Sequence, residues 1–238
     1  MVAVGRRHLP RGWSDLGRQL AIWFGFAVLY QIARGFADRN PAKAFANGDA
    51  VVRFETHITH RLYELTFQNF VDQRHLLETI VSWTYWNSEF TVVGLAVLWV
   101  YVRRHEAFVG LRNSILLANL IGLVGYVFVP TAPPRLLGVG FVNTHRNGLV
   151  NLAANPYAAM PSLHAADALI LGVVLFTVCR TPWAKALWAV WPAWVWFAVM
   201  ATGNHFWLDC VAGIGVAILS MTVVYNERIH RVFTVRRA

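Results

Sequence analysis

Long apolar runs separated by short polar segments dominate this sequence. A helix needs about 20 apolar residues to cross the hydrocarbon core of a bilayer, and six runs approach that length. They cover residues 19–36, 78–101, 113–130, 163–180, 183–201 and 206–226. The pattern therefore predicts an all-α polytopic membrane protein with six transmembrane helices, in which residues 1–238 form a single membrane domain.

The segment between the first two predicted spans has a different period. Within residues 44–74, apolar residues recur at spacings of three, four and five, with charged residues between them. These apolar positions are Val51, Phe54, Ile58, Leu62, Leu65 and Phe70. The pattern is typical of an amphipathic helix, and we expect it to lie in the headgroup layer.

The connection between the third and fourth spans, about residues 131–161, is rich in proline and glycine. These residues disfavour long regular elements. A long irregular loop in a compact protein is usually functional or disordered. Because both ends of this loop are tied to predicted spans, we interpret it as a catalytic loop.

Composition and charge agree with a membrane protein. The chain is 57% hydrophobic and 14% charged, with a mean hydropathy of +0.45, whereas soluble domains carry about a quarter charged residues. Lysine and arginine gather at alternate ends of the predicted spans, and short basic loops stay cytoplasmic. The net charge of +9 is therefore mainly a topology signal, and it predicts cytoplasmic termini. The pattern indicates that the protein lies in a bilayer, which we expect to be the cell (plasma) membrane. It disfavours nucleic acid as a partner.

Polar residues that can do chemistry stand where two spans begin. Ser162 and Asn204 are good N-cap types, and they precede His164 and His205 by two residues and one residue. In the predicted topology the fourth and sixth spans both begin at the outer face. Two helix amino termini with free N–H groups would meet there and form an anion site. The abundant anion in a membrane is a lipid phosphate.

His205 and Asp209 are four residues apart, so on a helix they would share a face. A carboxylate there can hold the proton of one ring nitrogen and leave the other as a lone pair, which prepares a histidine nucleophile. His164 suits a general acid. Asp167 could tune His164 or make a polar contact across helices. Each histidine alone could equally be an ordinary polar residue at the interface.

The motifs resemble a known family. "PSLH" at 161–164 and "HFWLD" at 205–209 resemble two signatures of the type-2 phosphatidic acid phosphatase superfamily. "PTAPPRL" at 130–136, "NPYAAMPSLHAA" at 155–166 and "TGNHFWLD" at 202–209 are closest to the branch related to fungal inositol phosphorylceramide synthase. The resemblance extends over roughly residues 112–215.

The resemblance implies a membrane phosphatase or phosphotransferase that works without a metal or other cofactor through a phosphohistidine. His205 would be the nucleophile, Asp209 its orienting carboxylate and His164 the proton donor. Ser162, Asn204 and Arg135 would hold the phosphate of a lipid substrate. Possible headgroup contacts are Tyr157, Asn155, Arg146 and Glu89.

Departures from the common phosphatase pattern bear on the substrate. Position 128 is Phe where that pattern has Lys, Leu136 follows Arg135 where it has Pro, and no basic residue shortly precedes His205. A monoester dianion is usually held by several cations. Arg135, with Arg146 or His145, offers fewer. This favours a phosphodiester substrate and a phosphotransferase, similar to an inositol phosphotransferase.

Alternatives remain open from the sequence. The protein could be a plain phosphatase of phosphatidic acid or polyprenyl pyrophosphate, or a lipid transporter with a proton-relay histidine. Metal-dependent hydrolysis needs several carboxylates, and only Glu89, Asp167 and Asp209 fall at membrane depth. For Glu89 we favour a hydrogen bond to Asn87 or to a neighbouring helix over a substrate contact. The sequence indicates no oligomeric state.

Overall fold

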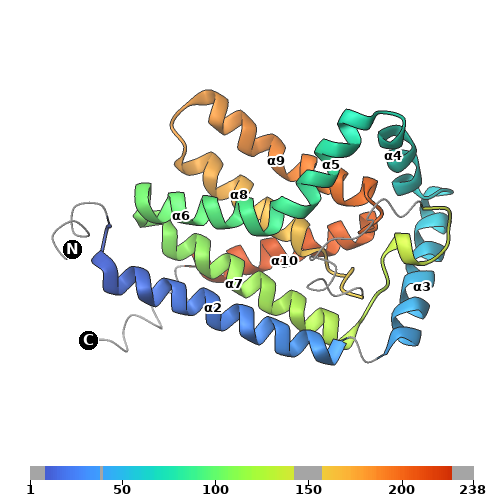
Figure 1. Cartoon of the computed structure of the whole chain (residues 1–238), viewed down its shortest axis with the longest axis horizontal. Coiled ribbons are helices and arrows are strands. Elements are labelled where there is room, and N and C mark those ends of the chain that lie inside the picture. Colours follow the sequence, from blue (N-terminus) through green and yellow to red (C-terminus); the bar gives the residue numbers. More distant parts are fainter. Residues whose placement is uncertain (1–8, 38–39, 142–156, 227–238) are drawn as a thin grey trace.

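The computed structural model describes residues 9–37, 40–141 and 157–226 (Figure 1). Over these residues the chain forms helices and turns, with one isolated parallel bridge between Thr131 and Ala158. The all-α prediction is confirmed. The helices are α2 (Gly12–Ala37), α3 (Pro41–Thr59), α4 (Tyr63–Asp72), α5 (His75–Asn87), α6 (Val93–Arg103), α7 (His105–Phe128), α8 (Leu163–Val178), α9 (Pro182–Ala201) and α10 (Trp207–Tyr225).

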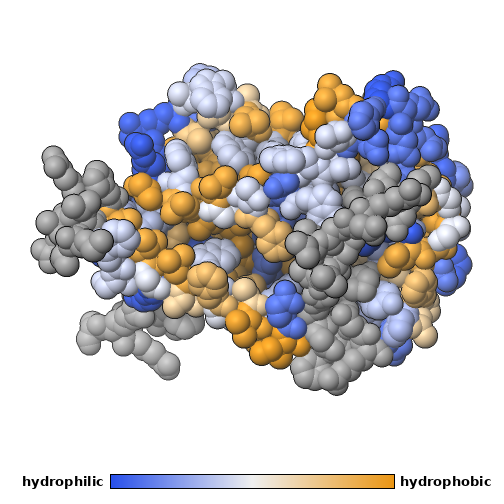
Figure 2. Space-filling model, in the orientation of Figure 1, coloured by the Kyte–Doolittle hydropathy of each residue, from blue (hydrophilic) through white to orange (hydrophobic). Residues whose placement is uncertain are grey.

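Three described helices, α7, α9 and α10, are long and apolar enough to cross a membrane, and α8 is a shorter apolar helix. Their positions match the last four predicted spans. Helix α2 runs beside α7 (Figure 1) and exposes Phe24, Val28 and Ile32. Figure 2 shows hydrophobic side chains over the face formed by α2 and α7, and a hydrophilic end at α4. The six-span topology stays a prediction.

The second predicted span, 78–101, is not one continuous helix. It divides into α5 and α6, joined by a π-helical turn at Ser88–Val92. Asn87 sits at the junction, where its amide donates to the Trp83 carbonyl oxygen at 2.9 Å and its Oδ1 accepts from the Thr91 hydroxyl at 3.0 Å. Such side-chain bonds compete with the regular helical ladder, and π turns often mark functional positions.

The single amphipathic helix expected over 44–74 is also divided. Helix α3 ends where His60 adopts a left-handed conformation with φ of 59°, and α4 begins at Tyr63. The Thr59 hydroxyl bridges the carbonyl oxygens of Glu55 and Arg61 at the break. A non-glycine residue with positive φ interrupts the helix, which hydrophobic periodicity does not reveal.

On this helix pair, apolar side chains are exposed and two acidic side chains are buried, the reverse of the pattern expected for a helix with a solvated polar face. Phe54, Ile58 and Phe70 are 45%, 52% and 49% exposed, whereas Glu55 and Glu64 are fully buried at 0%. The apolar residues point away from the helical core, where a membrane surface would receive them. The acidic residues point into the protein.

Candidate active site

The two histidines singled out by sequence lie together. His164 is in the first turn of α8, and His205 lies in the short segment between α9 and α10. Their ring centroids are 5.5 Å apart. Ser162 is the N-cap of α8, as predicted, and its hydroxyl oxygen accepts the Ala165 N–H at 3.3 Å.

Backbone contacts between α8 and α10 hold the histidines at this spacing. The Ser162 N–H donates to the Asp209 carbonyl oxygen at 3.0 Å. Gly213, one turn further along α10, lies directly against the Ser162 carbonyl oxygen, so that a Cβ there would collide with it. The close approach therefore depends on a residue without a side chain.

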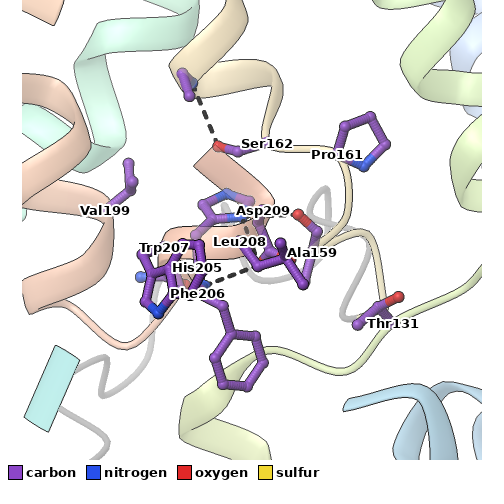
Figure 3. A network of polar contacts seen from close by, with 12 residues as sticks. Thr131, Ala159, Pro161, Ser162, Val199, His205, Phe206, Trp207, Leu208 and Asp209 are labelled. Atoms are coloured by element: carbon purple, nitrogen blue, oxygen red, sulfur yellow. Dashed lines mark hydrogen bonds and ion pairs between the residues drawn. The ribbon is translucent and has the colours of Figure 1, made fainter. Parts of the chain in front are cut away.

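The hydrogen bonds of His205 fix which ring nitrogen carries a proton (Figure 3). Its Nδ1 lies 2.9 Å from the Ala159 carbonyl oxygen and 3.5 Å from Asp209 Oδ2. A carbonyl oxygen only accepts, so Nδ1 must carry the hydrogen. In the neutral ring Nε2 is then the lone pair, as a nucleophile requires.

Asp209 makes two contacts, the predicted one with the His205 ring and a cap on α10. Its role as the orienting carboxylate stays a prediction. Helix α10 begins at Trp207, so His205 lies outside the helix and does not share a helical face with Asp209. The shorter contact of Asp209 Oδ2 is to the Phe206 N–H, at 2.8 Å. The contact of Asp209 with the α10 cap is therefore shorter than its contact with the His205 ring. The Ala159 carbonyl oxygen lies closer to the ring than Asp209 does.

Asn204 is not the N-cap of α10, because Phe206 occupies that position. The Asn204 amide instead donates to the Thr202 hydroxyl at 2.8 Å. The turn that carries it contains Gly203 with a positive φ of 65°. Asn204 nevertheless lines the same cavity as the histidines.

The expected anion site at the amino end of α10 is contradicted. The N–H groups of Trp207 and Leu208 donate to carboxyl oxygens of Glu64 and Glu55, at 2.6 and 2.9 Å. The preceding N–H, of Phe206, donates to Asp209 Oδ2. These three N–H groups are therefore not free to bind a phosphate. Sequence reasoning missed both glutamates, because acids on the polar face of an amphipathic helix look solvated.

A cavity of about 340 Å³ lies in front of the histidines. Its walls come from α2, from α5 and the π turn, from α7, and from α8 and the loops before α8 and α10. Aromatic and polar side chains alternate around it, as in many ligand pockets. Examples are Trp23, Tyr30, Tyr85, Asn119, Tyr126 and Arg135.

Glu89 meets the second histidine in this cavity. The π turn places Glu89 Oε2 3.3 Å from His164 Nε2. The Tyr85 ring stacks on the face of the His164 ring, with centroids 4.9 Å apart. Of the interpretations left open, the contact to a neighbouring helix is the one found, and its partner is a candidate catalytic residue. Asn87 bonds elsewhere.

Asp167 contacts α7 and not His164. Both of its carboxylate oxygens lie 3.1 Å from the Asn119 amide nitrogen. This is the polar contact across helices that was the alternative to tuning His164. Asp167 and Asn119 line the cavity, so two acidic side chains among the described residues, Asp167 and Glu89, face it.

Arg135 supplies the positive charge. Its backbone N–H donates to the Gly203 carbonyl oxygen at 3.0 Å, which ties the loop of Arg135 to the segment of His205. In the part of the chain that the structure describes, Arg135 is the only Lys or Arg that lines the cavity. Burial lowers the pKa of its guanidinium. An incoming anion would compensate the cost of burying this charge.

The remaining predicted contacts are less informative. The Tyr157 ring packs edge-on against Phe45, with centroids 6.2 Å apart, and does not line the cavity. Ser162 is fully buried and does not line it either. Arg146 and Asn155 lie outside the described residues. Their roles, like those of the other predicted substrate contacts, stay predictions.

Comparison with known proteins identifies the family. Residues 49–223 match the PAP2 superfamily. The chain belongs to the PAP2 superfamily. The match includes both histidines and the segment that joins them, and the resemblance seen in the sequence is confirmed. With its membrane-like helices, this PAP2 chain is an integral membrane protein.

Two curated relatives are similar to part of this PAP2 chain. A phosphoinositol dihydroceramide synthase of Bacteroides thetaiotaomicron is 31% identical over 126 residues, which are 44% of this chain and 41% of that protein. An inositol phosphorylceramide synthase of Candida albicans is 28% identical over 131 residues, 44% of this chain and 26% of that protein. The chain thus matches less than half of each relative's length.

A solved structure shares the fold. The crystal structure of Aquifex aeolicus LpxE superposes with a TM-score of 0.56 at 20% identity, over 69% of this chain and 94% of that one.

Proposed function

We propose that this protein is a membrane phosphotransferase that acts on a lipid-linked phosphate ester through a phosphohistidine on His205. The geometry of His205 carries the proposal. Its Nδ1 is held by the Ala159 carbonyl oxygen at 2.9 Å, which leaves Nε2 with the lone pair. The ring lines the cavity together with His164 and Arg135.

The chemistry follows from these groups. His205 Nε2 attacks phosphorus, a P–N bond forms, and the bond from phosphorus to the leaving oxygen breaks. His164 gives that oxygen its proton, and Glu89 stabilises the protonated imidazole at 3.3 Å. An acceptor hydroxyl then loses its proton to His164 and attacks phosphorus, which breaks the P–N bond and frees His205. Arg135 balances the charge on the phosphate oxygens.

Two observations favour transfer of a phosphodiester headgroup over release of inorganic phosphate. A single cation among the described cavity residues suits one negative charge better than two. Glu89 and Asp167 suit hydroxyl groups, which can donate to carboxylates, and disfavour a second phosphate. Because the matched relatives are named phosphoinositol dihydroceramide synthase and inositol phosphorylceramide synthase, we propose a phosphoinositol-type headgroup.

Purified protein distinguishes transfer from hydrolysis. It is incubated with phosphatidylinositol and a ceramide or diacylglycerol acceptor, and separately with phosphatidic acid. With phosphatidylinositol, headgroup transfer and release of inositol phosphate are measured; with phosphatidic acid, release of inorganic phosphate is measured. We expect transfer to exceed both kinds of release. Release of inositol phosphate or of inorganic phosphate without any transfer would make the protein a hydrolase.

His205→Ala tests the mechanism. We expect the variant to fall to background, while His75→Ala, at an exposed position on α5, keeps normal activity. Acid-labile labelled adduct should form on the wild type and be lost in His205→Ala. Wild-type turnover by His205→Ala would refute the mechanism.

Since every proposed step uses side chains, activity should also persist in excess EDTA. Loss of activity in EDTA that a divalent metal restores would contradict metal independence.

The distribution of basic residues supports cytoplasmic termini and a cavity at the outer face. A membrane-impermeant thiol reagent on intact cells tests this orientation. We expect a cysteine introduced as Asp49→Cys, at an exposed position on α3, to be labelled from outside, and Cys179 not to be labelled. The opposite labelling would reverse the orientation.

A further inference from the structure

Two glutamates from the α3–α4 helix pair bind the amino end of α10. Glu64 Oε1 accepts the Trp207 N–H at 2.6 Å, and Glu55 Oε1 accepts the Leu208 N–H at 2.9 Å. Both side chains are 0% exposed. The partners are 143 and 153 residues apart in the chain, so these bonds are tertiary contacts and not local caps.

These hydrogen bonds give partners to backbone N–H groups that would otherwise be buried without one, which would destabilise the protein. The first N–H groups of a helix have no partner within the helix, and leaving one buried without a bond costs about 1–3 kcal/mol. The partial negative charge of the accepting oxygens also interacts favourably with the helix dipole at this end. The two glutamates therefore attach α3 and α4 firmly to α10.

The attached segment is the one that carries His205. Phe206, Trp207 and Leu208 follow it directly, and each of their backbone N–H groups donates to a carboxyl oxygen, from Asp209, Glu64 and Glu55 in turn. The direction of the His205 ring depends on the path of this backbone (Figure 3). A shift of about 1 Å in a reacting group can cost about 100-fold in rate.

We propose that Glu55 and Glu64 are positioning residues that hold the His205 segment in its reactive orientation, so that the α3–α4 pair is part of the active-site framework. This proposal rests on the assignment of His205 as the nucleophile. Neither glutamate lines the cavity. Their effect is exerted through backbone N–H groups, and substrate is not required for it.

The charge state of the glutamates gives a second signature. Glu55 faces Glu64 of α4 and Asp209 of α10, and the thiol of Cys210 lies nearby on α10. Burial, followed by the charge of Glu64, raises the pKa of Glu55 to about 9, and burial also raises the pKa of Glu64. Glu55 is thus protonated at neutral pH. Its ionisation near pH 9 adds a buried negative charge that Glu64 and Asp209, beside the His205 segment, repel.

Four variants test the proposal: Glu55→Leu, Glu64→Leu, Glu55→Gln and Glu64→Gln. Asp49→Asn, on the exposed side of α3, is the matched control. The leucines remove the acceptors, so we expect kcat to fall at least 10-fold while KM changes less than about 3-fold. Glutamine keeps an acceptor oxygen, and both glutamine variants should stay within about 3-fold of wild type at pH 7. Folded leucine variants with wild-type kcat would overturn the proposal.

Two further measurements keep the proposal testable if the leucine variants do not fold. Activity of the wild type should decline as pH rises through about 9, and Glu55→Gln should remove this decline. An unchanged pH profile in Glu55→Gln would count against the positioning role. Hydrogen exchange, followed without substrate, should show faster exchange of the Trp207 and Leu208 amides in folded leucine variants than in Asp49→Asn.

The exchange measurement separates this proposal from the proposed function. If His205→Ala keeps its activity but Trp207 and Leu208 still lose protection, the nucleophile assignment fails while the attachment of α3 and α4 to α10 stands. If the amides keep their protection in the leucine variants, the positioning role fails whatever the reaction.

Discussion

Glu89 Oε2 lies 3.3 Å from His164 Nε2, across the boundary between the π turn and α8. The contact joins an interrupted apolar segment to the helix that carries the candidate general acid. A π turn contains one more residue than an α-helical turn. In a regular α-helix the Glu89 side chain would therefore point in a different direction, away from His164. The irregular turn therefore gives His164 its carboxylate partner.

Glu89→Gln should slow the reaction by about 10–100-fold on a lipid substrate, since a neutral amide stabilises protonated His164 less well than a carboxylate. The loss should be smaller with a nitrophenyl ester, whose leaving group needs little protonation. Rates on the two substrates, with Glu78→Gln on α5 as the control, check this. An equal loss on both would place Glu89 in substrate binding and not in proton transfer.

Asp209→Asn should cost less than it does in enzymes where a carboxylate alone sets the histidine tautomer, about 10⁴-fold in the serine protease triad. Here the Ala159 carbonyl oxygen already holds the His205 Nδ1 proton at 2.9 Å. The Asn oxygen can also still accept the Phe206 N–H. We expect a loss of about 10–100-fold in kcat. Asp209→Ala, which abolishes the cap, should lose more, and equal losses would refute the division of roles between Ala159 and Asp209.

The sequence located the histidines well because their position is set by local signals. A Pro-Ser pair followed by an apolar run fixes the start of α8, and His164 falls within its first turn. The predicted sixth span, 206–226, agrees with α10, but Asn204 is not its cap, because the Asn204 amide bonds back to Thr202. The Asn204 side chain could have capped α10 or bonded to Thr202, and the choice between them depends on tertiary packing.

The supporting acids were harder to predict. The contact of Glu89 depends on a one-residue irregularity in a helix, which no apolar periodicity records. Glu55 and Glu64 are charged residues that alternate with the exposed Phe54, Ile58 and Phe70 in an amphipathic pattern, so nothing local marks them as buried. Their burial comes from α10, more than 140 residues away in the chain. Long-range contacts of this kind cannot be inferred from local pattern.

Gly213→Ala should destabilise the protein, because the new Cβ would collide with the Ser162 carbonyl oxygen. Overpacking of this kind costs about 1–3 kcal/mol. Gly215→Ala is the matched control on the same helix, since nothing lies within 4 Å of a Cβ there. Thermal unfolding in detergent should show a melting temperature several degrees lower for Gly213→Ala only. Activity should fall as well, because the displaced turn carries His164. Equal melting temperatures for the two variants would contradict the close approach of α8 and α10.

Stability should fall as pH rises from about 5 to 9. The pKa of Glu55 is about 9 in the folded protein, against 4.5 for an ordinary glutamate. Between these values the folded chain keeps a proton that the unfolded chain has lost, so raising the pH favours unfolding. The effect is complete once Glu55 ionises in the folded state as well. Melting temperatures across this range should decline in the wild type and be flatter in Glu55→Gln, with Asp49→Asn following the wild type. A parallel decline in Glu55→Gln would show that another group holds the proton.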